Sequence, residues 1–493
     1  MRQVSGPTNH VVVVGAGLGG LSAALRLAGA GRSVTILERE LVPGGRAGLL
    51  ESGGYRFDTG PTVLTMPELI ADALHCVGEN LDDRLELMRI DPAYRARFAD
   101  GSSIDVIADV DAMAEQIRDV VGPADAQGYR RFADFARRLY DLERRDFIDR
   151  NLDSPLDLLR PSLAKLVALG GFRRLDAKVG SFFADDGLRR IFTFQAMYAG
   201  RSPYDALAIF AVIAYMDCVA GVWFPRGGMH AVPVALAAAA ADHGVDIRYG
   251  TTVTRVELSG SRAVAVHTAA GERIAADVVV LNPDLPVAWG ELLPSGRAPR
   301  RLARMEHSPS CALLLAGSTL RPASPVHHTI HFGAAWRETF RELIDEKVPA
   351  TDPSLLVSVP TVSDPQLAPD ARSSWYVLVP TPNLDGAMDW NRAGPGYRDR
   401  IVERLETLGY DGFGDAIEVE NFTTPADWER RGMARGTPFS LAHSFGQTGP
   451  FRPRNLAFDN VVFAGTGTQP GVGVPMVLMS GRLAAERIVG AVR

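Results

Sequence analysis

The chain opens on an apolar run that is followed by a glycine-rich turn and then by a helical pattern. HVVVVG, residues 10–15, is rich in β-branched residues, which is typical of a strand buried on both faces of a parallel sheet. LSAALRLAGAG, residues 21–31, has the apolar spacing of a helix, and SVTILE, residues 33–38, predicts a second buried strand. A strand, a glycine turn, a helix and a strand in this order predict a βαβ unit of an α/β fold.

Three glycines in the first turn have the spacing of a dinucleotide-binding loop. They are Gly15, Gly17 and Gly20. The first permits a tight turn, the second lets the backbone approach a pyrophosphate, and the third lets the helix pack close to the sheet. The free N–H groups of the helix N-terminus favour phosphate binding. Glu38 ends the second strand, where an acidic side chain binds ribose hydroxyls. We therefore expect these four residues to bind a dinucleotide.

Two further glycine-containing segments follow the acid and distinguish a flavin from a nicotinamide dinucleotide. PGGRAG covers residues 43–48, and GYRFDTGP covers residues 54–61. Gly45 and Gly60 allow the backbone to lie close to a cofactor, and the Arg46 guanidinium can contact phosphate or flavin oxygens. One loop beyond the acid, these segments are typical of flavoproteins. We therefore expect FAD as the cofactor.

A second glycine-rich loop occurs near the end of the chain. NVVFAG, residues 460–465, predicts a buried strand, and a helix is expected from about Val474. The loop between them lacks the GxGxxG spacing and a following acid, so it does not predict a second dinucleotide. Its backbone N–H groups and the helix N-terminus instead suit the flavin pyrimidine ring, where reduction places negative charge. The residues expected to bind the same FAD here are Gly465, Gly471, Val472 and Gly473.

The middle of the chain changes pattern twice. Residues 111–220 are rich in helical spacing, whereas residues 305–382 contain partly alternating strands separated by turn residues, which predict an antiparallel sheet. The sequence therefore predicts an α/β protein with a Rossmann-like (GR2-type) FAD-binding domain, an antiparallel-sheet substrate domain and a helical membrane-associating region. The expected ranges are 1–95, 221–290 and 440–493 for the FAD-binding domain, 96–220 for the helical substrate and membrane-contact region, and 291–439 for the sheet domain.

Two segments of the helical region need an interpretation of their own. Residues 207–224 form the longest apolar stretch, but Asp217 interrupts it, and a spanning helix needs about 20 mostly apolar residues. We interpret this stretch as buried core or tunnel wall. Residues 154–175 mix leucines with basic residues. That mixture is typical either of a helix on a membrane surface or of a solvated helix that covers the core.

Charge and cysteine content narrow the class of function. The chain of 493 residues has 52 Lys plus Arg and 58 Asp plus Glu, a net charge of −6, which argues against nucleic acid as a partner. Its three cysteines are scattered and predict neither a disulfide framework nor a metal site. The polar N-terminus MRQVSGPTNH lacks the apolar core of a signal peptide. We therefore expect a reducing, cytoplasmic environment.

Taken together, these segments resemble the bacterial-type phytoene desaturases, which are carotenoid desaturases within the larger amine-oxidase-like flavoprotein group. The similarity rests on VVVVGAGLGGLSAALRL, VPGGRAG, YRFDTGPTV, GVWFPRGGM and FAGTGTQPGVGVPMVLMSGRLAAE, which follow the family's order along essentially the whole chain. The resemblance implies one non-covalent FAD and an apolar tunnel for phytoene, with double bonds introduced stepwise toward lycopene. It also implies peripheral attachment to the inner face of the cell membrane.

The implied reaction removes a hydride and a proton from adjacent carbons. FAD takes the hydride, so the demanding step belongs to the cofactor. The allylic cation that remains then loses a proton to a carboxylate or to the reduced flavin. The protein has to exclude water and align one methylene with the flavin ring. Because no second dinucleotide site is visible, we expect oxygen or a membrane quinone, and not NAD(P)+, as the electron acceptor.

By the same resemblance, an aspartate and an arginine of the helical region are candidate catalytic residues near the flavin. They correspond to Asp157 and Arg160 in SPLDLLRP. An aspartate that lines an apolar tunnel has a raised pKa, which suits proton acceptance near neutral pH. The alternative is an ordinary helix-surface pair at i, i+3 spacing. The family often has an arginine directly before the aspartate, whereas this chain has Leu156.

Two other functions are compatible with parts of this pattern. One is another flavoenzyme of the same build: a carotenoid isomerase, a desaturase for shorter or hydroxylated polyenes, or an amine oxidase. The other is a non-enzymatic prenyl-binding protein like the GDP-dissociation inhibitors, which share the architecture and bind no flavin. An amine oxidase requires an aromatic cage, to which Trp223 and Phe224 could contribute. The non-enzyme lacks the flavin-binding set that is complete in this chain.

Overall fold

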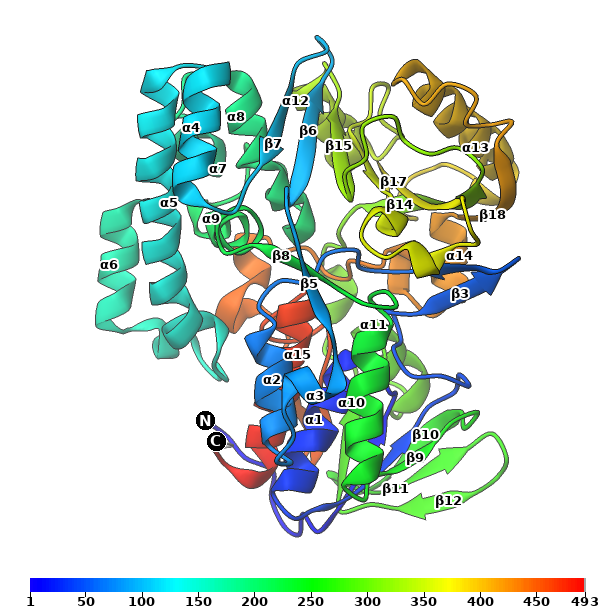
Figure 1. The fold of residues 1–493 in the computed structure, drawn as a ribbon. Coiled ribbons are helices and arrows are strands. Elements are labelled where there is room, and N and C mark those ends of the chain that lie inside the picture. The colour runs from blue at the N-terminus through cyan, green and yellow to red at the C-terminus, as the bar shows by residue number, and fades with distance from the viewer. Residues whose placement is uncertain (492–493) are drawn as a thin grey trace.

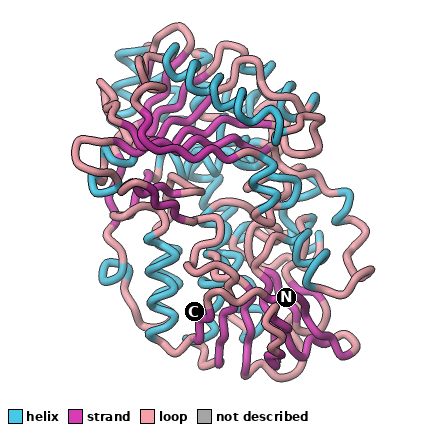
Figure 2. The backbone as a smooth tube through the Cα atoms, turned by 90° about the vertical axis from the view of Figure 1, so that its right-hand side faces the viewer, coloured by secondary structure: helices cyan, strands magenta, loops and turns pink. Residues whose placement is uncertain are grey.

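The protein is described by a computed structural model that covers residues 1–491 and has two lobes (Figure 1). The lower lobe in that view holds the first and last segments of the chain, and the upper lobe holds most of the middle. Figure 2, turned by 90°, shows a large sheet in each lobe. Segments far apart in the sequence therefore meet in the lower lobe.

The lower lobe is built on a six-stranded sheet with the order β19-β20-β13-β1-β2-β9. β1 runs parallel to β2 on one side and to β13 on the other, and only β19 is antiparallel to its neighbour. β1 and β13 are apolar along their length because both faces of the sheet are covered. The strands are β1 (His10–Val14), β2 (Ser33–Leu37), β9 (Asp246–Arg248), β13 (Val278–Leu281), β19 (Leu456–Ala457) and β20 (Val461–Phe463).

Helices cover one face of this sheet, and a smaller sheet covers the other. α1 packs against both α10 and α15, whose apolar residues share one core with Val11 and Val13. Val12 and Val14 point into a second core that includes the strands β10, β11 and β12. These three strands form a separate antiparallel sheet. The elements are α1 (Leu18–Gly29), α10 (Ala231–Asp242), α15 (Val474–Val489), β10 (Val253–Ser259), β11 (Arg262–Thr268) and β12 (Arg273–Ala275).

The upper lobe is built on a seven-stranded sheet with the order β18-β14-β17-β16-β15-β6-β7. All neighbours are antiparallel except β6 and β15, which are parallel. β6 and β7 join this sheet although we expected the helical region to begin at residue 96. The sequence of such short strands does not indicate which strands they pair with. The pairing of β6 with β15, and of β7 with β6, places both in the upper sheet. The strands are β6 (Tyr94–Phe98), β7 (Ser103–Val106), β14 (Ser310–Ser318), β15 (His328–Phe332), β16 (Leu355–Ser358), β17 (Ser373–Thr381) and β18 (Ile417–Thr423).

A group of helices adjoins the upper sheet and extends down to the lower lobe (Figure 1). Aromatic rings form its centre: the Phe132 ring centroid lies 4.8 Å from that of Phe192 and 5.6 Å from that of Phe183. The apolar stretch 207–224 folds into short helical turns that lead into β8. Within residues 1–491, no helix is both long enough and apolar enough to cross a bilayer. The helices are α4 (Val110–Val120), α5 (Pro123–Glu143), α6 (Pro161–Leu169), α7 (Leu175–Val179), α8 (Asp186–Ile191) and α9 (Ala211–Ala214).

Short elements connect the two lobes. β5 and β8 form an antiparallel pair between them, and β3 and β4 form a hairpin that packs against β17. The remaining elements are β3 (Leu49–Ser52), β4 (Tyr55–Asp58), β5 (Leu87–Ile90), β8 (Val222–Pro225), α2 (Glu68–His75), α3 (Leu81–Arg84), α11 (Leu285–Val287), α12 (Trp336–Phe340), α13 (Trp390–Thr407) and α14 (Pro425–Arg430).

Candidate functional site

The first glycine loop folds tightly over the carboxyl end of β1. α1 begins at Leu18, and its N-cap residue is Gly17, which has no side chain to cap the first turn. The N-terminal N–H groups of this helix are therefore available to an anionic ligand. Gly20 has no space for a side chain, because an added Cβ would lie 2.2 Å from the carbonyl oxygen of Gly15. The loop geometry thus depends on glycine at this position.

Glu38 lies at the carboxyl end of β2, beside the first loop. Its side chain is buried, with 6% of its surface exposed. One carboxylate oxygen accepts a hydrogen bond from the N–H of Ala16 at 2.6 Å, and the other accepts one from the N–H of Glu40 at 2.9 Å. These bonds fix the carboxylate next to the loop, where it can accept further hydrogen bonds from ribose hydroxyls.

The second motif contacts the first. The N–H of Gly44 donates to the carbonyl of Ala16 at 2.9 Å, and an added Cβ on Gly45 would lie 3.4 Å from Cα of Gly17. Gly60 lies against the carbonyl oxygen of Arg46, which an added Cβ would approach to 1.9 Å. The sequence-predicted residues of these two motifs therefore form one continuous backbone surface.

Arg46 connects this surface to the C-terminal loop. Its guanidinium donates to the Thr466 hydroxyl and lies 3.4 Å from a carboxylate oxygen of Asp284. Asp284 is buried and also accepts hydrogen bonds from the N–H of Ala434 and the hydroxyl of Ser440. About a quarter of the Arg46 side chain is exposed, so its remaining donors are available to a ligand.

The second glycine loop begins at the carboxyl end of β20, at the same edge of the sheet as the first. Gly471 and Gly473 have φ values of +148° and +108°, which favour glycine. Gly473 is the N-cap of α15, and it makes no side-chain hydrogen bond to that helix. Val472 between them is half-buried. Both α1 and α15 thus begin in glycine loops at the same edge of the sheet.

Asn282 lies between the two loops and was not among the residues that we predicted from the sequence. Its side-chain amide donates to the carbonyl of Ala464 at 3.2 Å. An added Cβ on Gly17 would lie 2.6 Å from its Oδ1, and one on Gly465 would lie 2.9 Å from its Nδ2. The available signal was its position directly after the buried strand β13, because carboxyl ends of parallel strands meet at one edge.

Arg452 was also not among the residues that we predicted from the sequence. Its side chain holds the second glycine loop in place. Its guanidinium is buried and donates to the carbonyls of Thr468 at 3.0 Å and Thr466 at 2.6 Å, and more weakly to those of Leu441 and Gln447. Burial lowers the pKa of Arg452 to about 9. The side chain is therefore a buried cation that is bound by backbone dipoles, and nothing in the local sequence pattern marks it as different from a surface arginine.

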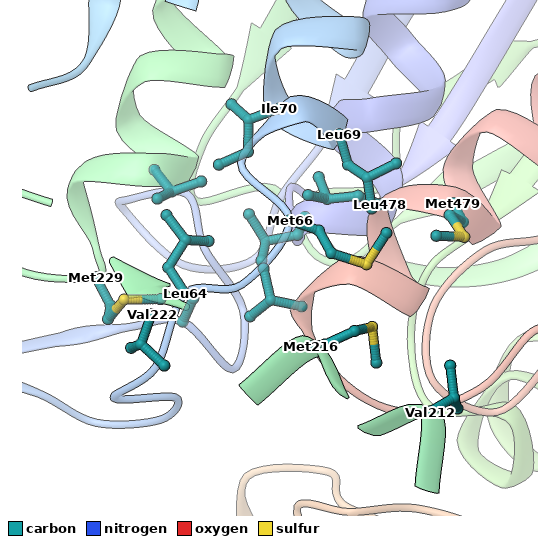
Figure 3. Close-up of a cluster of buried hydrophobic side chains, with 14 of the residues drawn as sticks. Leu64, Met66, Leu69, Ile70, Val212, Met216, Val222, Met229, Leu478 and Met479 are labelled. Carbon is teal, nitrogen blue, oxygen red and sulfur yellow. The ribbon is translucent and has the colours of Figure 1, made fainter. Parts of the chain in front are cut away.

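An apolar wall lies beside the loops, where α2, α9 and α15 meet (Figure 3). Met66, Met216 and Met479 converge there, and all three are buried. Leu64 and Val222 extend the wall toward β8. Thioether side chains adapt to irregular apolar partners, and these three belong to the main hydrophobic core of the protein.

The predicted catalytic pair lies on a segment that touches the second loop. The Gln469 side chain bonds both the N–H and the carbonyl of Leu152. The Asp157 carboxylate accepts from the N–H groups of Asp153 and Ser154 at 2.8 and 2.9 Å, and Arg160 lies 3.3 Å from Asp146. Both side chains thus have local structural partners, and their catalytic role stays a prediction.

Asp217, which interrupts the apolar stretch, is fully enclosed by the helical region. Only 4% of it is exposed, and its Oδ2 has no hydrogen-bond partner among residues 1–491. Burial raises the pKa of Asp217 to about 7. Because the carboxyl binds its proton more tightly in the folded chain, stability falls as the pH rises from about 4 to about 7 and stays low above that range.

We therefore expect Asp217→Asn to stabilise the protein by about 2 to 4 kcal/mol at pH 8 and to have little effect at pH 4, since the amide cannot ionise. Melting temperatures measured between pH 4 and pH 8 test this expectation. Asp205→Asn, at an exposed position of the same region, is the matched control and should show no such trend. A constant difference between Asp217→Asn and wild type at all pH values would contradict it.

The donor and acceptor set at this sheet edge fits a flavin dinucleotide. Glu38 supplies an acceptor for ribose, the α1 N-terminus and Arg46 supply donors for phosphate or flavin oxygens, and the α15 N-terminus supplies donors for a second polar group. Within residues 1–491, no group of three or more His, Cys, Asp or Glu could hold a metal ion, and all three cysteines are free thiols.

Comparison with known proteins agrees with this site. The model of a family described as flavin containing amine oxidoreductase matches residues 18–489. The chain is 57% identical to the phytoene dehydrogenase of Streptomyces griseus, over 99% of this chain and 97% of that protein. It is 38% identical to the zeta-carotene-forming phytoene desaturase of Myxococcus xanthus (97% and 94%), and 34% identical to the lycopene-forming phytoene desaturase of Pantoea ananas (96% and 97%).

Solved structures share the fold at low identity. A putrescine oxidase variant has a TM-score of 0.63 at 16% identity, covering 98% of this chain and 99% of that one. Cyclohexylamine oxidase of Brevibacterium oxydans has a TM-score of 0.60 at 17% identity, covering 99% of each chain. The α/β flavoprotein fold and the FAD cofactor expected from the sequence are thereby confirmed. The chain belongs to the flavin-containing amine oxidoreductases and, within them, to the family of the phytoene desaturases.

Proposed function

We propose that this protein is an FAD-dependent carotenoid desaturase that introduces double bonds into phytoene stepwise, toward lycopene or a related polyene. The observation that carries the proposal is the meeting of two glycine loops, Glu38 and Arg46 at one sheet edge beside an apolar wall. Relatives with 34–57% identity are phytoene dehydrogenases and desaturases. The non-enzymatic alternative is not favoured because the flavin-binding set is complete.

Residues of the chain bind and orient the cofactor. Glu38 accepts hydrogen bonds from ribose hydroxyls, and the α1 N-terminus with Arg46 holds the phosphates or flavin oxygens. The N–H groups of Val472 and Gly473, with the α15 N-terminus, provide fixed positive dipoles for the flavin pyrimidine ring. When bound, FAD supplies the two-electron acceptor for C–H bonds. Hydrogen bonds and close backbone contacts fix both loops, so these groups are preorganised for the cofactor.

The apolar wall performs the protein's other task. A saturated hydrocarbon segment offers no group for acid or base attack, so binding must come from apolar contact and shape. Met66, Met216 and Met479 are buried beside α15, and a substrate segment that lies along them would be shielded from water. Water exclusion protects a cationic carbon during the reaction, and the close fit aligns one methylene with the flavin ring. Asp157 and Arg160 remain the predicted catalytic pair.

We also propose that the protein docks on the inner face of the cell membrane, where its substrate resides. The helical region has an exposed apolar surface at Leu156, Leu159 and Val167, which are 71%, 73% and 58% exposed. Lys165 and Arg173 are exposed beside them. α6 lies at the outer edge of the molecule (Figure 1). Apolar side chains flanked by basic ones favour an anionic lipid surface, and a membrane quinone or oxygen would then reoxidise the flavin.

Leu156→Glu with Leu159→Glu is expected to release the protein from anionic liposomes, with binding at least about tenfold weaker, because two apolar contacts become like charges to the lipid. Sedimentation with phosphatidylglycerol vesicles measures the effect. Leu41→Glu with Val120→Glu places the same charges at other exposed apolar positions and should leave binding unchanged. If both double variants lose liposome binding equally, overall charge and not the surface around Leu156 and Leu159 accounts for the binding.

The proposed function is tested by mixing FAD-loaded protein anaerobically with liposomes that contain phytoene. We expect the visible flavin band to bleach while a polyene absorption at longer wavelength develops, and the product spectrum to count the new double bonds. Flavin that stays oxidised with phytoene present would reject the proposal for this substrate. A requirement for NAD(P)+ in steady turnover would reject oxygen or quinone as the electron acceptor.

A further inference from the structure

A buried histidine lies directly against the second glycine loop and has no part in the functions described so far. His443 is 8% exposed, and an added Cβ on Gly471 would lie 2.2 Å from its Cε1 and 2.5 Å from its Nε2. The Nε2 edge of the ring thus faces the backbone that we expect at the flavin. Among residues 1–491, Nε2 has no hydrogen-bond partner. An unpaired buried nitrogen is costly, and this one lies against the loop that we expect at the flavin, where a ligand or substrate could supply its partner.

The other ring nitrogen leads toward the surface. Nδ1 of His443 lies 3.3 Å from the Thr448 hydroxyl, and Thr448 is half-buried, two residues after the exposed Gly446. The backbone N–H of His443 donates to the carbonyl of Ala199 at 2.8 Å, and the Phe210 ring packs edge-on at 6.0 Å. These contacts hold the ring with one nitrogen toward the interior and one toward a polar exit.

The protonation state of His443 suits a base. Burial and the Arg452 cation beneath the loop lower the pKa of His443 well below its usual range, so the imidazole is neutral near pH 7. A weak base is sufficient here because an allylic carbocation is a very strong acid.

We propose that His443 is the base that accepts the proton lost from the substrate during desaturation; this inference rests on the proposed function. The substrate first loses one hydrogen with its electron pair to the oxidised flavin. The adjacent C–H bond then breaks, its electron pair forms the new double bond, and its proton forms a bond to Nε2 of His443. The proton on Nδ1 passes to the Thr448 hydroxyl and on to water, which leaves a neutral ring with its proton on Nε2. Proton exchange with water has to return the ring to the Nδ1–H tautomer before the next double bond is formed. Two electrons and one proton enter the flavin, and one proton leaves through His443.

The experiment uses FAD-loaded full-length protein, phytoene liposomes and the substitution His443→Phe, which keeps the ring and removes both nitrogens. We expect the polyene absorption to develop at least about 100-fold more slowly than in wild type. Two phytoene samples, each deuterated at one of the two adjacent methylenes, identify the slow step. In wild type, deuterium on the carbon that loses hydride should slow polyene formation. In His443→Phe, deuterium on its neighbour should slow polyene formation instead, because proton loss becomes limiting.

A structural role would have another signature. If His443→Phe only disturbs the loop, polyene formation slows but its sensitivity to the two labels stays as in wild type, which would overturn the proposal. The same conclusion follows if Asp157→Asn, and not His443→Phe, transfers the sensitivity to the neighbouring carbon. If His443→Phe loses FAD, His443→Gln replaces it in the same comparison. Wild-type protein that does not bleach at all would instead reject phytoene desaturation itself.

A measurement independent of turnover checks the protonation state. In ¹⁵N-histidine NMR spectra of the FAD-loaded protein without substrate, the resonance absent from His443→Phe belongs to His443. We expect it to remain that of a neutral ring with the proton on Nδ1 between pH 6 and pH 8. A ring protonated at pH 7, or a proton fixed on Nε2, would exclude a base at this position and overturn the proposal.

Discussion

Arg452→Met is expected to weaken FAD binding by at least about 100-fold and to lower the free energy of unfolding by about 3 to 5 kcal/mol. The guanidinium is buried and donates to the carbonyls of Thr466 and Thr468 inside the second glycine loop. Methionine fills a similar volume but leaves these carbonyls without donors, and each unpaired buried group costs about 1 to 3 kcal/mol. The loop then loses the geometry that presents its N–H groups to the flavin.

FAD titration by flavin fluorescence and chemical unfolding of the FAD-free protein measure the two effects separately. Arg454→Met, two residues further along and exposed, is the matched control and should change neither quantity by more than about 0.5 kcal/mol. If Arg452→Met weakens FAD binding while the FAD-free protein keeps its stability, the arginine acts through the cofactor. If Arg452→Met has the FAD affinity and the free energy of unfolding of the wild type, Arg452 does not anchor the loop.

Gly20→Ala is expected to reduce FAD affinity by at least about 100-fold although it adds a single methyl group. That methyl would lie 2.2 Å from the Gly15 carbonyl oxygen and 3.2 Å from a methyl group of Val13. Both neighbours belong to the backbone turn or the central strand, so neither can yield without moving the loop. The N-terminus of α1 would shift away from β1, and the alignment of its N–H groups with the pyrophosphate would be lost.

The same substitution at an open glycine provides the control. Gly290 has no heavy atom within 4 Å of an added Cβ and belongs to the same lobe, so Gly290→Ala should bind FAD as wild type does. Absorbance of the purified protein reports bound flavin, and titration of the FAD-free protein gives the affinity. Undiminished flavin content in Gly20→Ala would show that the loop tolerates the displacement and that this glycine is not required for binding.

Local pattern was sufficient to predict the first glycine loop, Glu38 and the second loop before α15. Each depends on residues adjacent in sequence: a β-branched run predicts the strand, the glycines the turn, and the apolar spacing the helix. The three strands β1, β13 and β20 could also be expected to share a sheet, because all are short and apolar throughout. Their common carboxyl edge then predicts where the cofactor lies.

Tertiary structure alone decided which polar residues support that edge. The sequence around Asn282, Arg452 and His443 has no distinctive pattern. Each of these side chains lies against a glycine loop only because the chain folds back on itself. It also assigned β6 and β7 to the upper sheet and separated β10–β12 from the lower one. Short strands carry a periodicity but no partner identity, since pairing depends on long-range packing. Sequence therefore predicted the cofactor and the two glycine loops, whereas only the folded chain showed which polar side chains lie against those loops.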